Sequence, residues 1–159
     1  DKKFAALTKR HVNPKYVNVE LKKNSKPPRV ITTIDFATLN YLERYNLGNK
    51  YFTSERYVET IKLLEIIEFS KLNIKQRRHL MQLHVEALFN LGNHARIVNI
   101  LTENKEYDLN DELLFLLGVS LTKLGNKTHA LQAFNEIIKN HPNSDYQNIV
   151  KLQVRVLKR

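Results

Sequence analysis

The feature that most constrains the fold of this chain is a segment that occurs twice, 33 residues apart. Leu91-Gly92-Asn93 in the first copy corresponds to Leu124-Gly125-Asn126 in the second. In both copies apolar residues recur at helical spacing before and after the Gly-Asn pair. Glycine readily adopts the left-handed backbone conformation that ends many helices. The segment therefore predicts a unit of two helices joined by a tight turn, repeated along the chain.

The few glycine and proline residues support a repeat of this length. Three units fit the chain, at residues 41–74, 78–110 and 111–144. Counted from the first residue of each unit, all four glycines fall on position 8 or position 15: Gly48, Gly92, Gly118 and Gly125. Glycine at position 8 would let two helices approach closely. The only proline beyond residue 28, Pro142, would end the last helix of the third unit.

The third unit resembles a tetratricopeptide repeat, a helix–turn–helix unit. The small and large residues that mark this family are matched by Leu117, Gly118, Leu121, Ala130, Phe134 and Pro142. Leu114 and Ile137 depart from the family pattern but remain apolar. In the second unit His84-Val85 replaces the usual Leu-Gly, so its first helix is expected to pack less closely. In the first unit Ser54-Glu55 stands at the turn, where glycine would be expected.

The resemblance implies an all-α fold, a right-handed superhelix of antiparallel helix pairs. We expect this helical domain to span residues 34–159. It would follow a basic, proline-containing arm at residues 1–33 that is extended or disordered. A capping helix is expected at residues 145–158, because the last repeat would otherwise expose an apolar face. Ser144 and Gln147 have the spacing of a capping box at the start of that helix.

Positive charge is concentrated at the two ends of the sequence. Lys and Arg number 26 against 16 Asp and Glu. Residues 1–30 carry a net charge of +7, residues 31–145 carry −1, and the last fourteen residues carry +4. Basic ends can contact nucleic acid, anionic lipid or an acidic protein. Because the arm lacks interleaved aromatic residues and the body has no matching basic face, we do not expect nucleic acid as the main partner.

The sequence offers no catalytic constellation. Without cysteine it has no thiol nucleophile and no thiolate metal site. Its six histidines do not form a His-Glu-x-x-His motif, and no serine lies in a Gly-x-Ser-x-Gly elbow. No apolar stretch approaches the roughly 20 residues of a membrane-spanning helix. We therefore predict no enzyme, no metal or other cofactor, and no transmembrane segment.

In the family that the third unit resembles, the first helices of successive repeats line a concave groove. Carrying the groove-facing positions onto this chain gives ten candidate partner-binding residues: Tyr45, Asn49, Phe52, Gln82, Glu86, Phe89, Asn90, Phe115, Val119 and Lys123. The rings would supply contact area and the amides would orient a peptide backbone. Family members that grip a C-terminal carboxylate use cations at places filled here by Tyr45, Glu112 and Leu116. An apolar or amphipathic segment is therefore the expected ligand.

The predicted function is protein–protein interaction, as a scaffold, an adaptor or a stabiliser of a partner. The alternative is a binder of nucleic acid or an anionic membrane surface, through the basic arm and the C-terminal helix. Self-association is a further alternative, with Tyr16, Val17, Val19 and Leu21 of the arm lying in a groove. The resemblance favours the bacterial cell envelope, periplasmic or membrane-associated, over the cytoplasm. The first residue, Asp1 rather than Met, fits removal of an export segment.

Overall fold

The protein is all-α over the part of the chain that the computed structural model describes, residues 38–67, 72–104 and 109–159. This part contains no strand and has these helices: α2 (Tyr41–Thr53), α3 (Tyr57–Glu65), α4 (Ile74–Asn90), α5 (His94–Glu103), α6 (Asp111–Lys123), α7 (Lys127–Asn140) and α8 (Gln147–Leu157). The all-α prediction is confirmed. The predicted arm at residues 1–33 lies outside the described residues.

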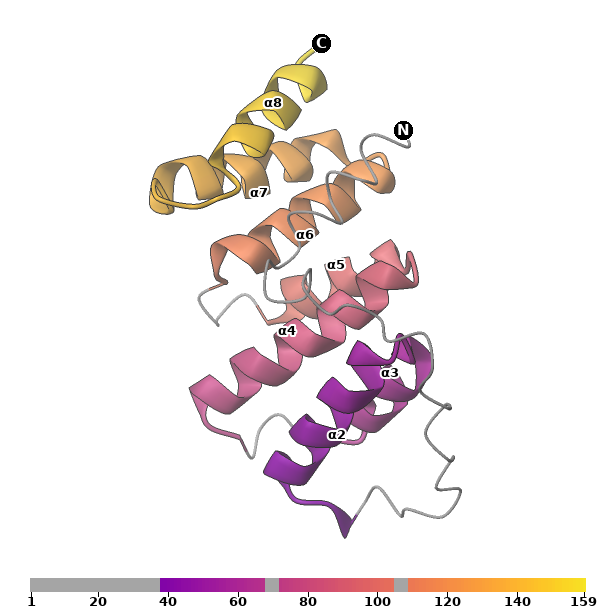
Figure 1. Cartoon of the computed structure of the whole chain (residues 1–159). Helices are drawn as coiled ribbons and strands as arrows, with labels where there is room; N and C mark the ends of the chain where they lie inside the picture. The colour runs from indigo at the N-terminus through magenta and orange to yellow at the C-terminus, as the bar shows by residue number, and fades with distance from the viewer. Residues whose placement is uncertain (1–37, 68–71, 105–108) are drawn as a thin grey trace.

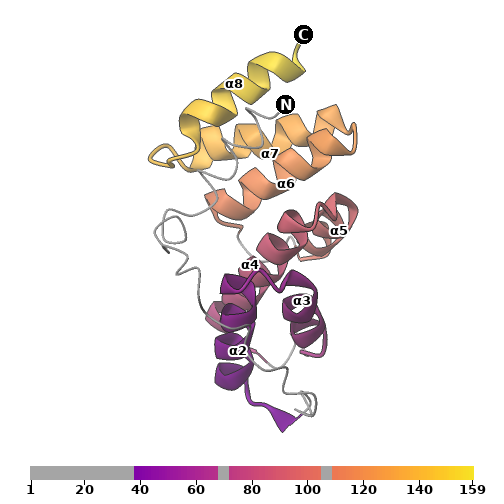
Figure 2. The same cartoon turned by 45° about the vertical axis from the view of Figure 1, so that its right-hand side comes forward.

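Successive helices pack as antiparallel pairs that stack into an elongated array. α2 packs on α3, α4 on α5 and α6 on α7, and α8 packs on α7 at the end of the array. The first helices of the pairs are also neighbours, since α4 contacts both α2 and α6. Figures 1 and 2 show α2 and α3 at one end of the stack and α8 at the other. The arrangement places α2, α4, α6 and α8 in a row.

Glycine at position 8 permits close helix packing, as the sequence predicted. A Cβ atom added to Gly118 would lie 2.4 Å from Cε1 of Phe134, so α6 and α7 meet at a point where no side chain fits. At Gly48 the nearest atom would be Cδ2 of Leu83, 3.1 Å away. α4 carries Val85 at this position and packs on α5 less extensively than α6 packs on α7. The less close packing expected for the second unit is therefore present.

The turn within each pair uses a left-handed residue at position 15. Gly92 and Gly125 have φ values of 71° and 78°. In the first unit Glu55 takes the same place with φ 59°, although it is not a glycine. An L-residue in this conformation costs about 1–2 kcal/mol, so the surrounding contacts must compensate.

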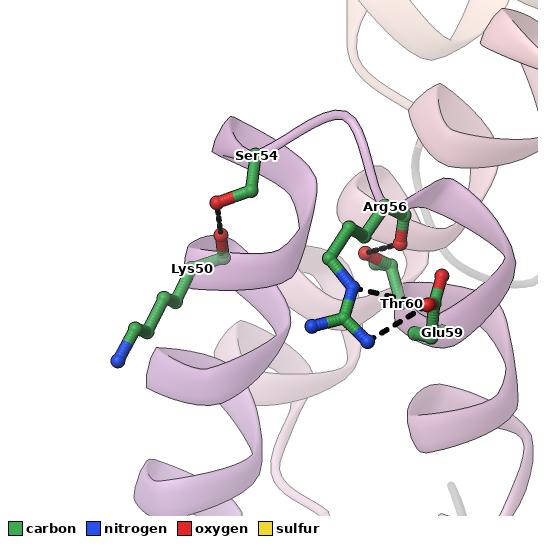
Figure 3. A network of polar contacts seen from close by, with 5 residues as sticks. All are labelled: Lys50, Ser54, Arg56, Glu59 and Thr60. Atoms are coloured by element: carbon green, nitrogen blue, oxygen red, sulfur yellow. Dashed lines mark hydrogen bonds and ion pairs between the residues drawn. The ribbon is translucent and has the colours of Figure 1, made fainter. Parts of the chain in front are cut away.

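Figure 3 shows the polar contacts around this glycine-free turn. The Ser54 hydroxyl donates to the Lys50 carbonyl at 2.9 Å, which satisfies a carbonyl at the end of α2. The Arg56 guanidinium donates twice to Glu59, at 2.8 and 3.0 Å. The Thr60 hydroxyl donates back to the Arg56 carbonyl at 3.0 Å. The first of these bonds lies at the end of α2 and the others at the start of α3. The turn itself is closed by the backbone N–H groups of Glu55 and Arg56, which donate to the carbonyls of Phe52 and Tyr51, each at 2.9 Å.

Asparagine side chains cap the helices of all three pairs. Residues whose side-chain oxygen accepts a backbone N–H of the following helix are Asn40, Asn73, Asn93, Asn110 and Asn126. In α2 and α4 the cap is reciprocal, because the side chains of Glu43 and Gln76 accept the backbone N–H of the cap residue. Asparagine is among the preferred residues at this place because its short side chain reaches the unpaired N–H groups.

The capping box predicted at Ser144 and Gln147 is wrong. The Ser144 hydroxyl accepts the N–H of Tyr146 rather than that of Gln147. The Gln147 side chain donates instead to the carbonyls of Ile137 and His141, at 3.1 and 2.9 Å. Both carbonyls also accept a backbone N–H, so the Gln147 amide adds a second bond to each and joins α8 to the end of α7. Tertiary contact outweighs the local pattern here.

Candidate functional site

A ladder of contacts runs along the row of first helices. Position 5 of each first helix contacts position 2 of the next one. The rings of Tyr45 in α2 and His79 in α4 lie 5.8 Å apart. Gln82 in α4 donates to Glu112 in α6 at 2.6 Å. The rings of Phe115 in α6 and Tyr146, just before α8, stack with centroids 4.6 Å apart. The same register therefore connects all four helices.

The middle of the ladder is a small acidic cluster. The Gln82 amide donates both to Glu112 and to Glu86, the latter at 3.0 Å. Glu86 is buried, with 1% of its surface exposed. Burial, strengthened by the neighbouring Glu112 carboxylate, raises the pKa of Glu86 to about 8. Burial also raises the pKa of Glu112. Glu86 is thus mainly protonated near neutral pH.

One oxygen of this cluster has no partner. Oε1 of Glu112 is buried and forms no hydrogen bond, while its Oε2 accepts from Gln82. A buried carboxylate oxygen without a donor is unfavourable by about 1–3 kcal/mol or more. Nearby, burial and the negative charge of Glu112 raise the pKa of Tyr146, so that its hydroxyl keeps its proton. The surface of α4 and α6 along the ladder is therefore rich in acceptors.

The structure divides the ten predicted groove residues into two sets. Six of them are half-buried or exposed and so available to a ligand: Tyr45, Asn49, Gln82, Phe89, Asn90 and Lys123. The other four are buried in the core: Phe52, Glu86, Phe115 and Val119. Phe115 is fully buried because its ring packs against both Tyr146 and Phe134. Of the aromatic residues predicted for the groove, Tyr45 and Phe89 are half-buried, so part of each ring is exposed.

The two asparagines predicted for the groove form hydrogen bonds within their own helices. The side-chain amide of Asn49 donates to the Tyr45 carbonyl at 3.0 Å. That of Asn90 donates to the Glu86 carbonyl at 2.8 Å. Each bond fixes the amide one helical turn back and leaves its oxygen as an acceptor. Phe89 is held from the other side, with its ring edge-on to that of His94 at 5.7 Å.

A cleft that sequence analysis missed lies among α5, α6 and α7. It has a volume of about 290 Å³ and an apolar floor that includes Val98, Leu117 and Ala133. Polar residues at the cleft include His129 and Glu136. Its residues come from both helices of a pair and from the second helix of the pair before. Nothing in the repeat pattern marks them as a set, because the cleft forms only when two units stack.

The second helices are joined by their own polar contact. Arg96 of α5 forms an ion pair with Glu65 of α3. His84 of α4 is 5% exposed, and its Nε2 has no hydrogen-bond partner. Burial lowers the pKa of His84 to about 4, and the positive charge of Arg96 adds to the effect. The histidine is therefore neutral at physiological pH and packs as part of the core.

The described residues contain no cluster of three or more His, Asp or Glu side chains placed to hold a metal ion. Within the same residues, no helix has the length and apolar character needed to cross a membrane.

Stacked helix pairs with one repeated register define this molecule as a helical-repeat protein. Residues 112–144 match the family model of the tetratricopeptide repeat, so this segment of the chain contains a repeat of that kind. The match coincides with the third predicted unit, whereas the bounds of the first two units stay predictions. Searches of curated proteins and of solved structures found no match. A tetratricopeptide repeat implies a protein–protein interaction module, and such repeats are usually not catalytic.

Proposed function

We propose that this protein binds an apolar or amphipathic segment of another protein along the row formed by α2, α4 and α6. The bound segment would lie across the ladder of position-5 and position-2 residues. The protein would act as a scaffold, an adaptor or a stabiliser of its partner. The bacterial cell envelope is the proposed place of action, as a prediction of the sequence alone.

The ladder is the observation that carries this proposal. It brings side chains from separate repeats into one continuous line, so that an extended or helical ligand can touch several repeats at once. Tyr45 and Gln82 belong to this line, and Phe89, near the C-terminal end of α4, offers a second half-buried ring. Aromatic residues beside hydrogen-bonding groups are typical of protein-binding surfaces.

The unpartnered carboxyl oxygen of Glu112 argues against an acidic ligand. Glu86 and Glu112 lie beneath the surface of α4 and α6, and an oxygen of Glu112 lacks a donor. An acidic segment would meet these carboxyl groups, whereas a segment with basic residues would complement them. An amphipathic segment that places a basic side chain near Glu112 fits this surface best.

The test is affinity capture from native cell lysate at 300 mM salt with the full chain. The groove variant would combine Tyr45→Ser and Phe89→Ser, both half-buried positions, so the helical circular dichroism should persist. Phe52 and Phe115 are unsuitable for this purpose, because they are core residues whose loss would destabilise the fold. Val58→Ser is the matched control, since Val58 is an exposed apolar residue of α3.

A protein retained by the wild type and by the Val58 variant, and lost by the groove variant, would support the proposal. Equal retention by the groove variant would move the binding surface elsewhere. If only nucleic acid or lipid is captured, and only near 50 mM salt, the basic ends of the chain would be the site instead, because phosphate binding weakens steeply with salt.

A further inference from the structure

α8 stands in the place of a first helix of a further repeat. Tyr146 precedes it at the position-2 place of the ladder and stacks on Phe115 of α6. α8 packs on α7 just as α6 packs on α5. In each of the three pairs the first helix is covered by a second helix, as α7 covers α6. Among the described residues no helix covers α8 in this way, and Figures 1 and 2 show it at the end of the stack.

The uncovered side of α8 exposes two apolar side chains beside the polar Asn148, Lys151 and Arg155. Leu152 is 53% exposed and Val156 is 54% exposed, and the two lie one helical turn apart. The opposite side of the helix is already used, because Val150 and Val154 are buried against the array. α8 thus has one apolar face in the core and a short apolar strip, Leu152 and Val156, in solvent. A capping helix with a wholly polar outer face would not have this strip.

Cations lie next to this apolar strip. Arg155 follows Leu152 by three residues on α8, so the two side chains are neighbours on the helix surface, and Arg159 lies two residues beyond the end of α8. The segment from Tyr146 to Arg159 carries a net charge of +4 and no acidic residue. Within the described part of the chain, Arg155 and Arg159 form no ion pair with a carboxylate side chain.

We infer that the outer face of α8 docks an amphipathic helix with acidic residues along one flank, contributed by a partner protein. That helix would take the place that the second helix of a further repeat would occupy. Its apolar residues would cover Leu152 and Val156, and its carboxylates would pair with Arg155 and Arg159. This surface is separate from the ladder, so the inference does not rest on the proposed groove.

Other occupants fit this face less well. A second copy of the chain presenting the same face would bring two sets of cations together, which is unfavourable. A lipid surface is normally bound by a helix with a broad apolar face, whereas α8 exposes Leu152 and Val156 on one narrow strip. A single acidic helix matches the strip in both width and charge.

The test is selection from a displayed library of peptides about 18 residues long, built on a helix-forming frame of that length. The immobilised target is the full chain, and binders to the Leu152→Ser/Val156→Ser variant are removed by counter-selection. The expected survivors carry apolar residues at i, i+3 and i+7 with a net negative charge. Binding of a survivor, measured by fluorescence anisotropy, should weaken at least about tenfold in Arg155→Glu. Leu42→Ser, an exposed apolar site in α2, should bind normally.

Circular dichroism would establish that the α8 variants keep their helices, as expected for substitutions at exposed positions. The Tyr45→Ser/Phe89→Ser groove variant should bind the selected peptides like the wild type, which separates failure of this inference from failure of the proposed groove. Survivors that are neutral or basic would overturn the inference, and so would the absence of survivors. Two further results would also overturn it: binding to phosphatidylserine vesicles that is lost in the α8 variant, or a concentration-dependent dimer mass that is lost in it.

Discussion

At the scale of single residues, the two glycines at position 8 have different consequences for stability. Gly118 faces the buried ring of Phe134, which would lie within 2.8 Å of an added methyl group at three of its atoms. We expect Gly118→Ala to lower the free energy of unfolding by about 1–3 kcal/mol, because the ring cannot move in a packed core. Urea denaturation followed by circular dichroism would measure this loss.

Gly48→Ala is the control for that experiment. Its nearest neighbour is a methyl carbon of Leu83 at 3.1 Å, and alanine favours a helix over glycine by up to about 1 kcal/mol. The variant should therefore change stability little. A loss of the same size in both variants would contradict the view that the contact with Phe134 sets the cost.

The repeat spacing predicted the packing role of these glycines well, because two helices that approach this closely leave room for almost no other residue. The same spacing could not show that Glu55 takes the left-handed place in the first turn. The backbone N–H groups of Glu55 and Arg56 donate to the carbonyls of Phe52 and Tyr51 at the end of α2, and the residue type at position 15 does not encode these bonds. Sequence patterns thus locate a turn better than they identify what stabilises it.

At the scale of single helices, the asparagine caps offer a direct test. The Asn110 side chain accepts the N–H of Leu113 at 2.9 Å, and Leu113 is fully buried. Asn110→Ala should lower the free energy of unfolding by about 1 kcal/mol, because that N–H would lose its partner. Thermal unfolding would show the effect as a decrease in Tm.

Asn135→Ala is the matched control for the cap. Asn135 is exposed in the middle of α7, where alanine is at least as favourable for the helix. The control should keep or slightly raise the Tm. If Asn110→Ala is equally harmless, the cap contributes nothing measurable to stability.

The helices themselves were largely predictable, whereas their caps were only partly so. Apolar periodicity and the Leu-Gly-Asn turns predicted the helix pairs, since both depend on local geometry. The number of asparagines in the sequence carried a structural signal that spacing analysis did not use. At Ser144 the local pattern misled, because Gln147 bonds to carbonyls of α7 rather than to its own helix.

At the scale of the whole molecule, the repeat register predicted which helices line the row but not which of their side chains remain on the surface. Phe115 and Glu86 were predicted to face a groove, yet both are buried in the structure. Burial depends on how far each unit rotates against the next, which no single repeat encodes. The ladder contacts from Tyr45 to Tyr146 likewise became evident only from the stacked structure.

Stacking also creates two buried titratable groups with opposite effects on stability. The pKa of His84 is lowered to about 4. Between pH 6.5 and 4 the unfolded state therefore binds a proton at this histidine and the folded state does not. Stability from this group falls as the pH falls from 6.5 to 4. Glu86 has its pKa raised to about 8, so above pH 4.5 the unfolded state releases a proton that the folded state keeps. Stability from that group falls as the pH rises from 4.5 to 8.

The two slopes oppose each other between pH 4.5 and 6.5, and Glu86 dominates from pH 6.5 to 8. We therefore expect the Tm of the wild type to decline over the upper range. Glu86→Gln should remove most of this decline, because glutamine keeps the acceptor for Gln82 but has no proton to lose. The gain at pH 8 should be a few kcal/mol at most, since one pKa unit corresponds to about 1.4 kcal/mol.

His84→Leu tests the contribution of the histidine to the same pH dependence of stability. This variant should leave the decline in stability above pH 6.5 in place. It should reduce the loss of stability between pH 6.5 and 4, because leucine does not titrate. Calorimetric scans of both variants at half-unit pH steps would separate the two groups. Unchanged pH profiles in both would show that neither side chain is buried in the way that the stacking of α3, α4, α5 and α6 requires.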